Sequence, residues 1–113
     1  MPIFVVYTNL PKDKIPKDFL EQACAFISKE LGKPEHLVVV RVNADQMMSV
    51  GNSSDLCASI ELRNITDGAK IKEHAVNITD FVERTLNIPK DRFFINFTNE
   101  RGEDISFKGK TFG

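Results

Sequence analysis

Apolar residues recur every three or four positions in two segments of the chain, near residues 16–31 and 69–86. This spacing is typical of a helix that buries one face. Pro16 lies near the predicted first turn of the first helix, where a missing N–H costs nothing, and Gly32 and Pro34 predict its end. The predicted buried positions are Phe19, Leu20, Ala23, Phe26, Ile27 and Leu31 in the first helix, and Ile71, Ala75, Ile78, Val82 and Leu86 in the second.

Four other segments have the composition or the alternation of β-strands. They are residues 2–8, 37–42, 56–62 and 92–98. The connecting segments 10–15 and 43–54 are predicted to be loops, and the second could contain a short strand at 47–50. The tail at 105–112 is predicted to form either a short hairpin or an extra edge strand.

The two halves of the chain repeat the same order of elements. Residues 31–40 align with 86–95, and the first strand aligns with residues 58–63. The chain therefore reads as two βαβ units in a single domain, 1–113. Right-handed crossovers place both helices, antiparallel to each other, on one face of a four-stranded mixed sheet of the α+β class.

Three of the predicted strands (2–8, 37–42 and 92–98) are apolar on both faces. Two helices can cover only one face of the sheet, so the other face would expose more apolar surface than a monomer usually tolerates. We expect copies of the same chain to cover it. The alternative is that loops and the tail do so.

Composition narrows the function classes. Among 113 residues, 15 Lys and Arg balance 16 Asp and Glu, which excludes the basic surface expected of a nucleic-acid binder. No apolar run is long enough to insert into a membrane. No spacing suits a metal site or a phosphate-binding loop, so we expect neither metal nor cofactor.

We interpret Cys24 and Cys57 as two buried thiols rather than as a disulfide.

Pro2 is an unusual residue so close to the N-terminus. Removal of Met1 would leave a secondary amine at the end of a buried strand. An α-amine has an ordinary pKa of about 8, and burial lowers the pKa by disfavouring the charged form. Such an amine could act as a general base near neutral pH. The alternative is that Pro2 merely begins an edge strand.

A set of short motifs lies in register along nearly the whole chain. They are Pro2-x-Phe4, Thr8-Asn9, Gly32-Lys33-Pro34, Asp45-Gln46-Met47-Met48, Gly51-x-Ser53-Ser54, Pro89-x-Asp91-Arg92, Ile95-Asn96 and Gly109-x-Thr111-Phe112. In this set the chain resembles the macrophage migration inhibitory factor and D-dopachrome tautomerase family. The resemblance implies a homotrimer and a cofactor-independent keto–enol tautomerase that acts on small aromatic substrates of the phenylpyruvate or dopachrome type.

The resemblance also implies the site residues. Pro2 matches the catalytic proline, Lys33 the lysine that meets the anionic end of the substrate, Ile65 a wall of the pocket, and Asn96 a pocket asparagine contributed across the subunit interface. Without the resemblance, Lys33 would be read as a solvated surface lysine and Asn96 as a polar residue on a strand face.

The chain also departs from the family pattern. Phe94 stands where many members have a pocket tyrosine, Phe107 where a tryptophan is common, Asn64-Ile65-Thr66 where Ser-Ile-Gly is frequent, and Ile60 where some members have the second cysteine of Cys-x-x-Cys. The loss of the tyrosine hydroxyl means that an aromatic substrate is held more by shape than by a hydrogen bond. The loss of the second cysteine argues against thiol–disulfide chemistry.

A second function remains open, that of a cytokine-like protein that binds a cell-surface receptor and keeps weak or vestigial tautomerase activity. Residues 1–8 lack the features of a conventional signal peptide. We therefore expect a cytoplasmic protein that is also secreted by an unconventional route. The glycosylation patterns at Asn52, Asn64, Asn77 and Asn96 are then incidental.

Overall fold

A computed structural model describes residues 1–64 and 70–113 of the chain. Its main helices are α1, Phe19–Leu31, and α2, Ile71–Leu86. Its strands are β1, Ile3–Thr8; β2, Val39–Asn43; β3, Ala58–Asn64; β4, Phe93–Asn99; β5, Ser106–Phe107; and β6, Lys110–Thr111. Short 3-10 turns connect several of these elements.

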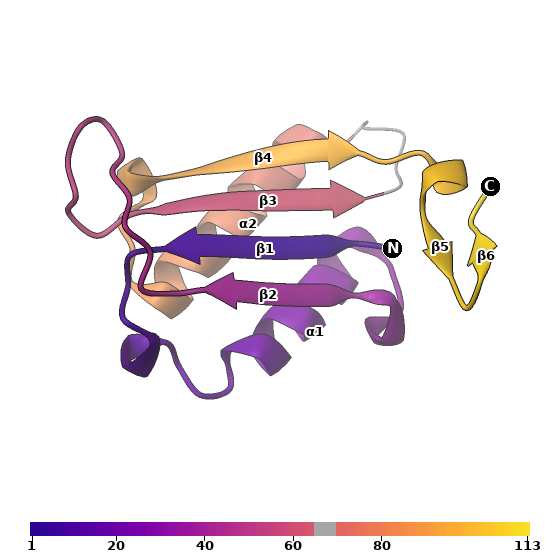
Figure 1. The fold of residues 1–113 in the computed structure, drawn as a ribbon, viewed down its shortest axis with the longest axis horizontal. Coiled ribbons are helices and arrows are strands. Elements are labelled where there is room, and N and C mark those ends of the chain that lie inside the picture. Colours follow the sequence, from indigo (N-terminus) through magenta and orange to yellow (C-terminus); the bar gives the residue numbers. More distant parts are fainter. Residues whose placement is uncertain (65–69) are drawn as a thin grey trace.

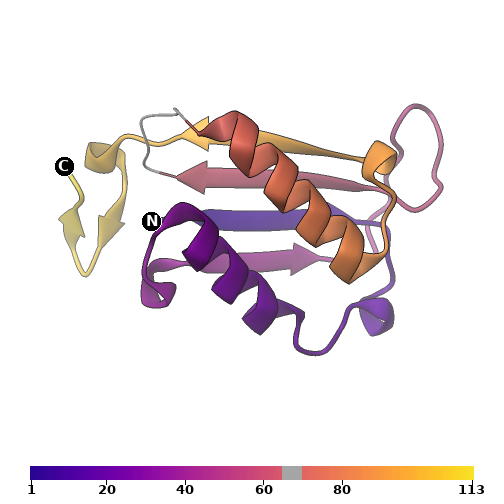
Figure 2. The same cartoon turned by 180° about the vertical axis from the view of Figure 1, so that it is seen from behind.

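The main sheet has four strands in the order β2-β1-β3-β4. β1 pairs with β2 and β3 pairs with β4 in parallel, whereas the central pair, β1 and β3, is antiparallel. Both helices lie side by side on one face of the sheet and run in opposite directions (Figures 1 and 2). The predicted α+β fold with two βαβ units is confirmed.

The hydrophobic core lies between this sheet and the two helices. Alternate strand residues face the helices because successive side chains in a strand point to opposite faces. The fully or almost fully buried core side chains include Phe4 and Val6 of β1, Ile60 and Leu62 of β3, Phe19, Ala23 and Ile27 of α1, and Ile78 and Val82 of α2. Leu20, predicted to be buried, is 53% exposed.

The ends of the helices follow from local backbone chemistry. Gly32 ends α1 in the left-handed region, with φ 65°, and Asn87 ends α2 in the same way, with φ 55°. The start of α1 differs from the prediction. The N–H of Phe19 donates to the Pro16 carbonyl at 3.0 Å and closes a separate turn, so the helix begins at Phe19 and Pro16 precedes its first turn.

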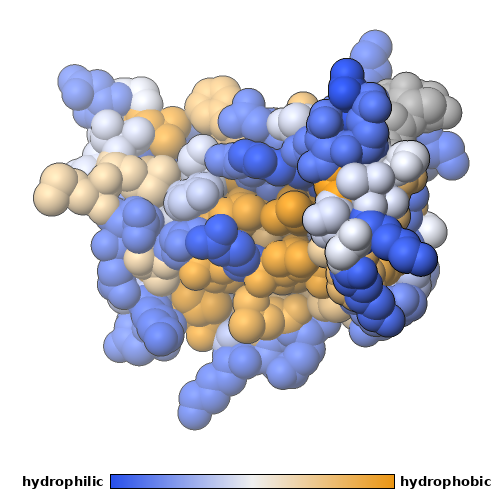
Figure 3. Space-filling view, turned by 45° about the vertical axis from the view of Figure 1, so that its right-hand side comes forward, coloured by the Kyte–Doolittle hydropathy of each residue, from blue (hydrophilic) through white to orange (hydrophobic). Residues whose placement is uncertain are grey.

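The second face of the sheet carries no helix and faces the viewer in Figure 1. Ile3, Val5 and Tyr7 of β1 lie on it, as the sequence predicts, and Figure 3 shows hydrophobic side chains gathered in the middle of this face. We call this surface the open face. Arg41 of β2 also lies on it, which makes β2 less apolar there than predicted, and β3 contributes its polar side, Ser59, Glu61 and Arg63, as its alternation predicts.

The structure decides between the alternatives left for the tail and for the loop at 43–54. The tail forms a hairpin, β5–β6, at the end of the molecule that also holds the N-terminus (Figure 1). The loop between β2 and β3 contains only a single bridge, between Val50 and Ser53, and no strand at 47–50. Cys24 and Cys57 are both free thiols; Cys57 is buried, as predicted, and Cys24 is only partly buried.

Candidate functional site

Pro2 lies at the start of β1, and its side chain is fully buried. Its carbonyl accepts a hydrogen bond from the Val39 N–H at 2.9 Å, which extends the parallel ladder between β1 and β2 by one residue. The residue is therefore held firmly in the sheet rather than in a loose terminus.

The N-terminal amine lies in a setting that favours its neutral form. With Met1 present, partial burial of the α-amine lowers its pKa from the ordinary value of 8.0, and the charge of Lys33 lowers the pKa further. Because Pro2 is more deeply buried than Met1, removal of Met1 would move the amine towards the core.

Lys33 is fixed by the end of α1. The N–H groups of Gly32 and Lys33 both donate to the Ser28 carbonyl, at 3.0 Å in the case of Lys33, and the Ser28 hydroxyl donates to the Lys33 carbonyl. The lysine is half-buried. Its charge acts on the N-terminal amine, so Pro2 and Lys33 belong to the same end of the sheet.

Asn96 lies elsewhere on the same chain. It is exposed on β4, opposite Glu61 of β3, and points to the open face. With strands about 4.8 Å apart and residues about 3.3 Å apart, Asn96 lies roughly 14 Å from Pro2 within one chain. One chain therefore does not bring these two predicted site residues together.

The fourth predicted site residue, Ile65, lies outside the described residues. Asn64, just before it, is buried, and its carbonyl accepts the Glu100 N–H at 2.8 Å. Asn64 Oδ1 is buried without a hydrogen-bond partner among the described residues.

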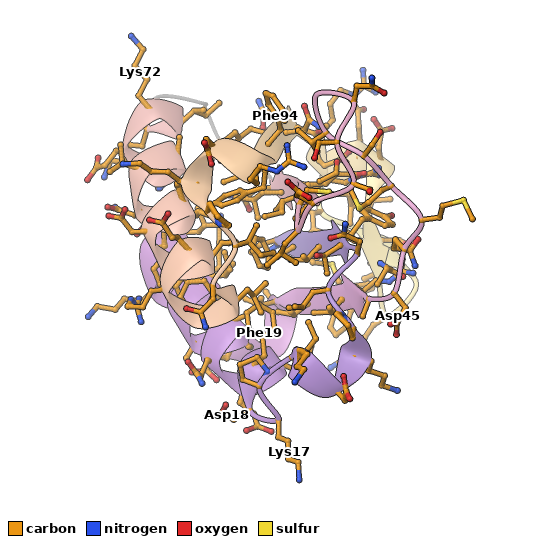
Figure 4. All side chains as sticks on the ribbon, turned by 90° about the vertical axis from the view of Figure 1, so that its left-hand side faces the viewer. Lys17, Asp18, Phe19, Asp45, Lys72 and Phe94 are labelled. Atoms are coloured by element: carbon orange, nitrogen blue, oxygen red, sulfur yellow. The ribbon has the colours of Figure 1, made fainter. Side chains whose placement is uncertain are left out.

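Phe94 is 68% exposed and shares the side of β4 that carries Asn96. Figure 4 shows it at the outer edge of the sheet. Phe107, on the hairpin, is 38% exposed. These are the two aromatic positions at which the sequence departs from the family pattern, and both are accessible in the single chain.

Two groups of residues acquire a role that sequence reasoning missed. Arg92 donates to four backbone carbonyls of the β2–β3 loop at 2.9–3.3 Å, those of Val50, Ser53, Asp55 and Leu56. The side-chain amide of Asn9 donates to the Ser54 carbonyl of the same loop. The other group joins the helices and consists of Glu30, His74 and Asn77. The motifs around Asn9 and Arg92 are visible in the sequence, but their partners are not.

The groups at the N-terminal end of β1 suit proton transfer. In the described ranges, no three His, Cys, Asp or Glu side chains come together as metal ligands. The groups that the structure does bring together are a strand-end amine of lowered pKa and a lysine, which suit an anionic substrate and a general base. In the same described ranges, no helix is long and apolar enough to cross a membrane.

Known proteins match this chain over its whole length. The family model of macrophage migration inhibitory factor (MIF) matches residues 1–113. A MIF homolog from Brugia malayi is 38% identical over 115 residues, which cover all of both chains. A MIF homolog from Trichinella spiralis is 35% identical over 114 residues, covering 99% of this chain and 100% of the homolog.

Solved structures of MIF proteins have the same fold as this chain. The MIF structure from Trichinella spiralis superposes with a TM-score of 0.93 at 34% identity and covers 97% of this chain and 99% of that one. The MIF structure from Oncomelania hupensis superposes with a TM-score of 0.92 at 21% identity over 98% of this chain and 97% of that one, which supports the fold alone. The chain belongs to the macrophage migration inhibitory factor family, a family of the tautomerase fold that combines cytokine-like function with isomerase activity in general.

Proposed function

We propose that the chain is a keto–enol tautomerase whose catalytic base is the amine of Pro2 after removal of Met1. The observation that carries this proposal is the position of the N-terminus: a buried strand end where burial and Lys33 both lower the pKa of an α-amine. A neutral amine has a lone pair, which a protonated amine lacks, so this setting keeps the base active near neutral pH.

The reaction needs only one proton shuttle. The Pro2 nitrogen takes a proton from the carbon next to the substrate carbonyl, the electron pair moves to the carbonyl oxygen, and the proton returns to that oxygen. Lys33 binds the substrate carboxylate through a charge-assisted hydrogen bond. Small aromatic keto acids of the phenylpyruvate type fit these two groups.

The pocket is completed by a second subunit. Asn96 and Phe94 lie on the open face, roughly 14 Å and roughly 19 Å from Pro2 in the same chain by strand geometry, so they would reach a Pro2 pocket from a neighbouring copy. The hydrophobic middle of the open face supplies a reason to associate (Figure 3). We therefore assign a homotrimer in which Pro2, Lys33 and Ile65 come from one chain and Asn96 from its neighbour.

The decisive experiment compares two N-termini. Insertion of one alanine between Met1 and Pro2 converts the proline amine into an amide, which has no basic nitrogen. We expect loss of phenylpyruvate turnover with the trimer intact, measured by absorbance of the enol and by light scattering. Pro2→Gly keeps a free primary amine and should retain weak activity.

The pH profile tests the same base. We expect the burial and the Lys33 charge that lower the pKa of the Met1 amine to lower that of the freed Pro2 amine as well, so kcat/KM should rise with pH and level off below the ordinary pKa of about 8. Equal turnover by the blocked and free N-termini would eliminate the proline mechanism. The receptor-binding function with vestigial activity would then take its place.

We also propose that the protein is cytoplasmic and leaves cells by an unconventional route. Asn52 is exposed in a turn and followed by Ser53 and Ser54, so it would be open to glycosylation in the secretory pathway. Mass spectrometry of secreted protein should find Asn52 unmodified. A glycan there would show passage through that pathway.

A further inference from the structure

Three polar side chains join the two helices on the side of the molecule away from the open face. Glu30 lies in the last turn of α1, and His74 and Asn77 lie about one turn apart on α2. His74 Nδ1 is 2.7 Å from Glu30 Oε2, and Asn77 Nδ2 donates to Oε1 and Oε2 at 3.2 and 3.0 Å. We call these residues the helix-bridging cluster.

The cluster is well shielded from water. The side chains of His74 and Glu30 are 14% and 13% exposed, so their contact is screened less than a surface ion pair. An ionised carboxylate can only accept hydrogen bonds, so His74 Nδ1 carries the hydrogen directed at Glu30. Three contacts on one carboxylate fix its position and orientation.

Among the described residues, the further charges that line the cavities beside the cluster lie on its outer side. A groove of about 440 Å³ between the helices is lined by Lys29 of α1 and by Lys70, Glu73 and Asp80 of α2. On its inner side, His74 borders a small cavity whose other lining residues carry no charge; they are Leu31, Leu62, Asn64, Ile71, Phe97, Thr98 and Asn99.

Glu30 is also part of the turn that carries Lys33. The Ser28 carbonyl accepts from the N–H groups of Gly32 and Lys33, and the Ser28 hydroxyl donates to the Lys33 carbonyl. Glu30 lies between the two ends of this hydrogen-bonded unit. A contact that fixes Glu30 against α2 therefore fixes the direction in which the chain leaves α1 and presents Lys33.

We propose that His74 and Asn77, by holding Glu30, position Lys33 for the substrate carboxylate at the N-terminal end of β1. This inference rests on the proposed function of Pro2 and Lys33. The end of α1 and the start of β1 lie at the same end of the sheet (Figures 1 and 2). His74 and Asn77 act through Glu30 and the end of α1, and so they are positioning residues.

The test compares an anionic substrate with an uncharged one. Glu30→Ala should raise KM for phenylpyruvate roughly fivefold to tenfold and change kcat by less than about twofold, because a charge-assisted contact to the carboxylate is displaced while the base is untouched. KM for the methyl ester of phenylpyruvate should stay unchanged. Asn77→Ala should give a smaller shift, and Glu30→Gln, which keeps an acceptor for His74, should lie close to the parent protein.

Two controls separate positioning from general damage. Lys72 is exposed on α2 and projects into solvent in Figure 4, so Lys72→Ala should leave both KM values unchanged. In a Lys33→Ala background, Glu30→Ala should add no further increase. An equal increase in KM for both substrates, or an increase that persists without Lys33, would overturn the proposal.

A readout without substrate separates this proposal from the proposed function. NMR titration of the N-terminal amine should show a higher pKa in Glu30→Ala and in Asn77→Ala, because Lys33 lies farther away. An unchanged pKa in both variants would reject the positioning role. Lack of phenylpyruvate turnover by the parent protein would instead reject the tautomerase function and leave the amine titration as the test of the cluster.

Discussion

Single side chains hold the long loop between β2 and β3 in place. Arg92 contacts the carbonyls of Val50, Ser53, Asp55 and Leu56, and the Asn9 side chain both donates to Ser54 and accepts the Cys57 N–H. A guanidinium can serve several acceptors because its five donors form a rigid fork. These two side chains hold the loop together with backbone hydrogen bonds, among them those from the Asp45 and Gln46 N–H groups to the Leu10 and Thr8 carbonyls.

Arg92→Ala should lower the free energy of unfolding by about 2 kcal/mol, because partly buried carbonyls lose their donors. Urea denaturation followed by circular dichroism measures the change. Arg101→Ala is the matched control, since Arg101 pairs with Glu103 and Asp104 but is 68% exposed. It should change stability by less than about 0.5 kcal/mol. A larger loss for Arg101 than for Arg92 would contradict this ranking.

The ends of the two helices show how one backbone requirement is met by different residues. Both end on a residue in the left-handed region, Gly32 in α1 and Asn87 in α2. Glycine adopts this conformation without steric cost, whereas other residues are strained there. Asparagine tolerates it better than most residues, which accounts for its place at the end of α2.

This difference predicts opposite effects of two substitutions. Gly32→Ala should destabilise the protein by about 1 kcal/mol, and Asn87→Gly should stabilise it by several tenths of a kcal/mol. No atom lies within 4 Å of a Cβ built at Gly32, so the loss would reflect backbone strain and not a clash. Thermal unfolding of both variants checks the signs. A stabilising Gly32→Ala would show that the left-handed end is not required.

At the scale of the whole molecule, no helix or further strand among residues 1–64 and 70–113 packs on the open face or extends the sheet of the tail hairpin. On the open face, Ile3 and Tyr7 are only partly buried, and the hairpin β5–β6 forms a separate two-stranded sheet. An isolated hairpin of two-residue strands is marginally stable in water. Both features are explained if copies of the chain cover one another.

Sedimentation at micromolar concentration should give a particle about three times the chain mass of 12.8 kDa. Tyr7→Glu places a charge on the open face at a side chain that is only partly buried in the single chain, and it should dissociate this particle because association would bury the charge without a partner. Lys72→Glu, on the exposed side of α2, should leave it intact. A monomer in the parent protein would contradict the trimer and remove Asn96 from the pocket.

The sequence by itself determined the order of elements, the mixed sheet and the end of α1 at Gly32. These features depend on periodicity and on local backbone preference, which are written in neighbouring residues. It also indicated the family through colinear motifs that begin at Pro2, and the comparisons confirm that membership. The start of α1 was predicted too early because a proline near a helix start does not say which turn is helical.

Only the tertiary structure decided which distant residues meet. Glu30 and His74 are 44 residues apart, and Arg92 and Val50 are 42 apart, so no local pattern pairs them. The alternation of β3 already predicted its polar side, Ser59, Glu61 and Arg63, whereas the register decided that Arg41 shares the open face with that side, because register fixes which side chains are neighbours on a face. The same register places Asn96 away from Pro2 within one chain. Local sequence specifies each element, whereas hydrogen bonds between elements depend on how the packed core places them.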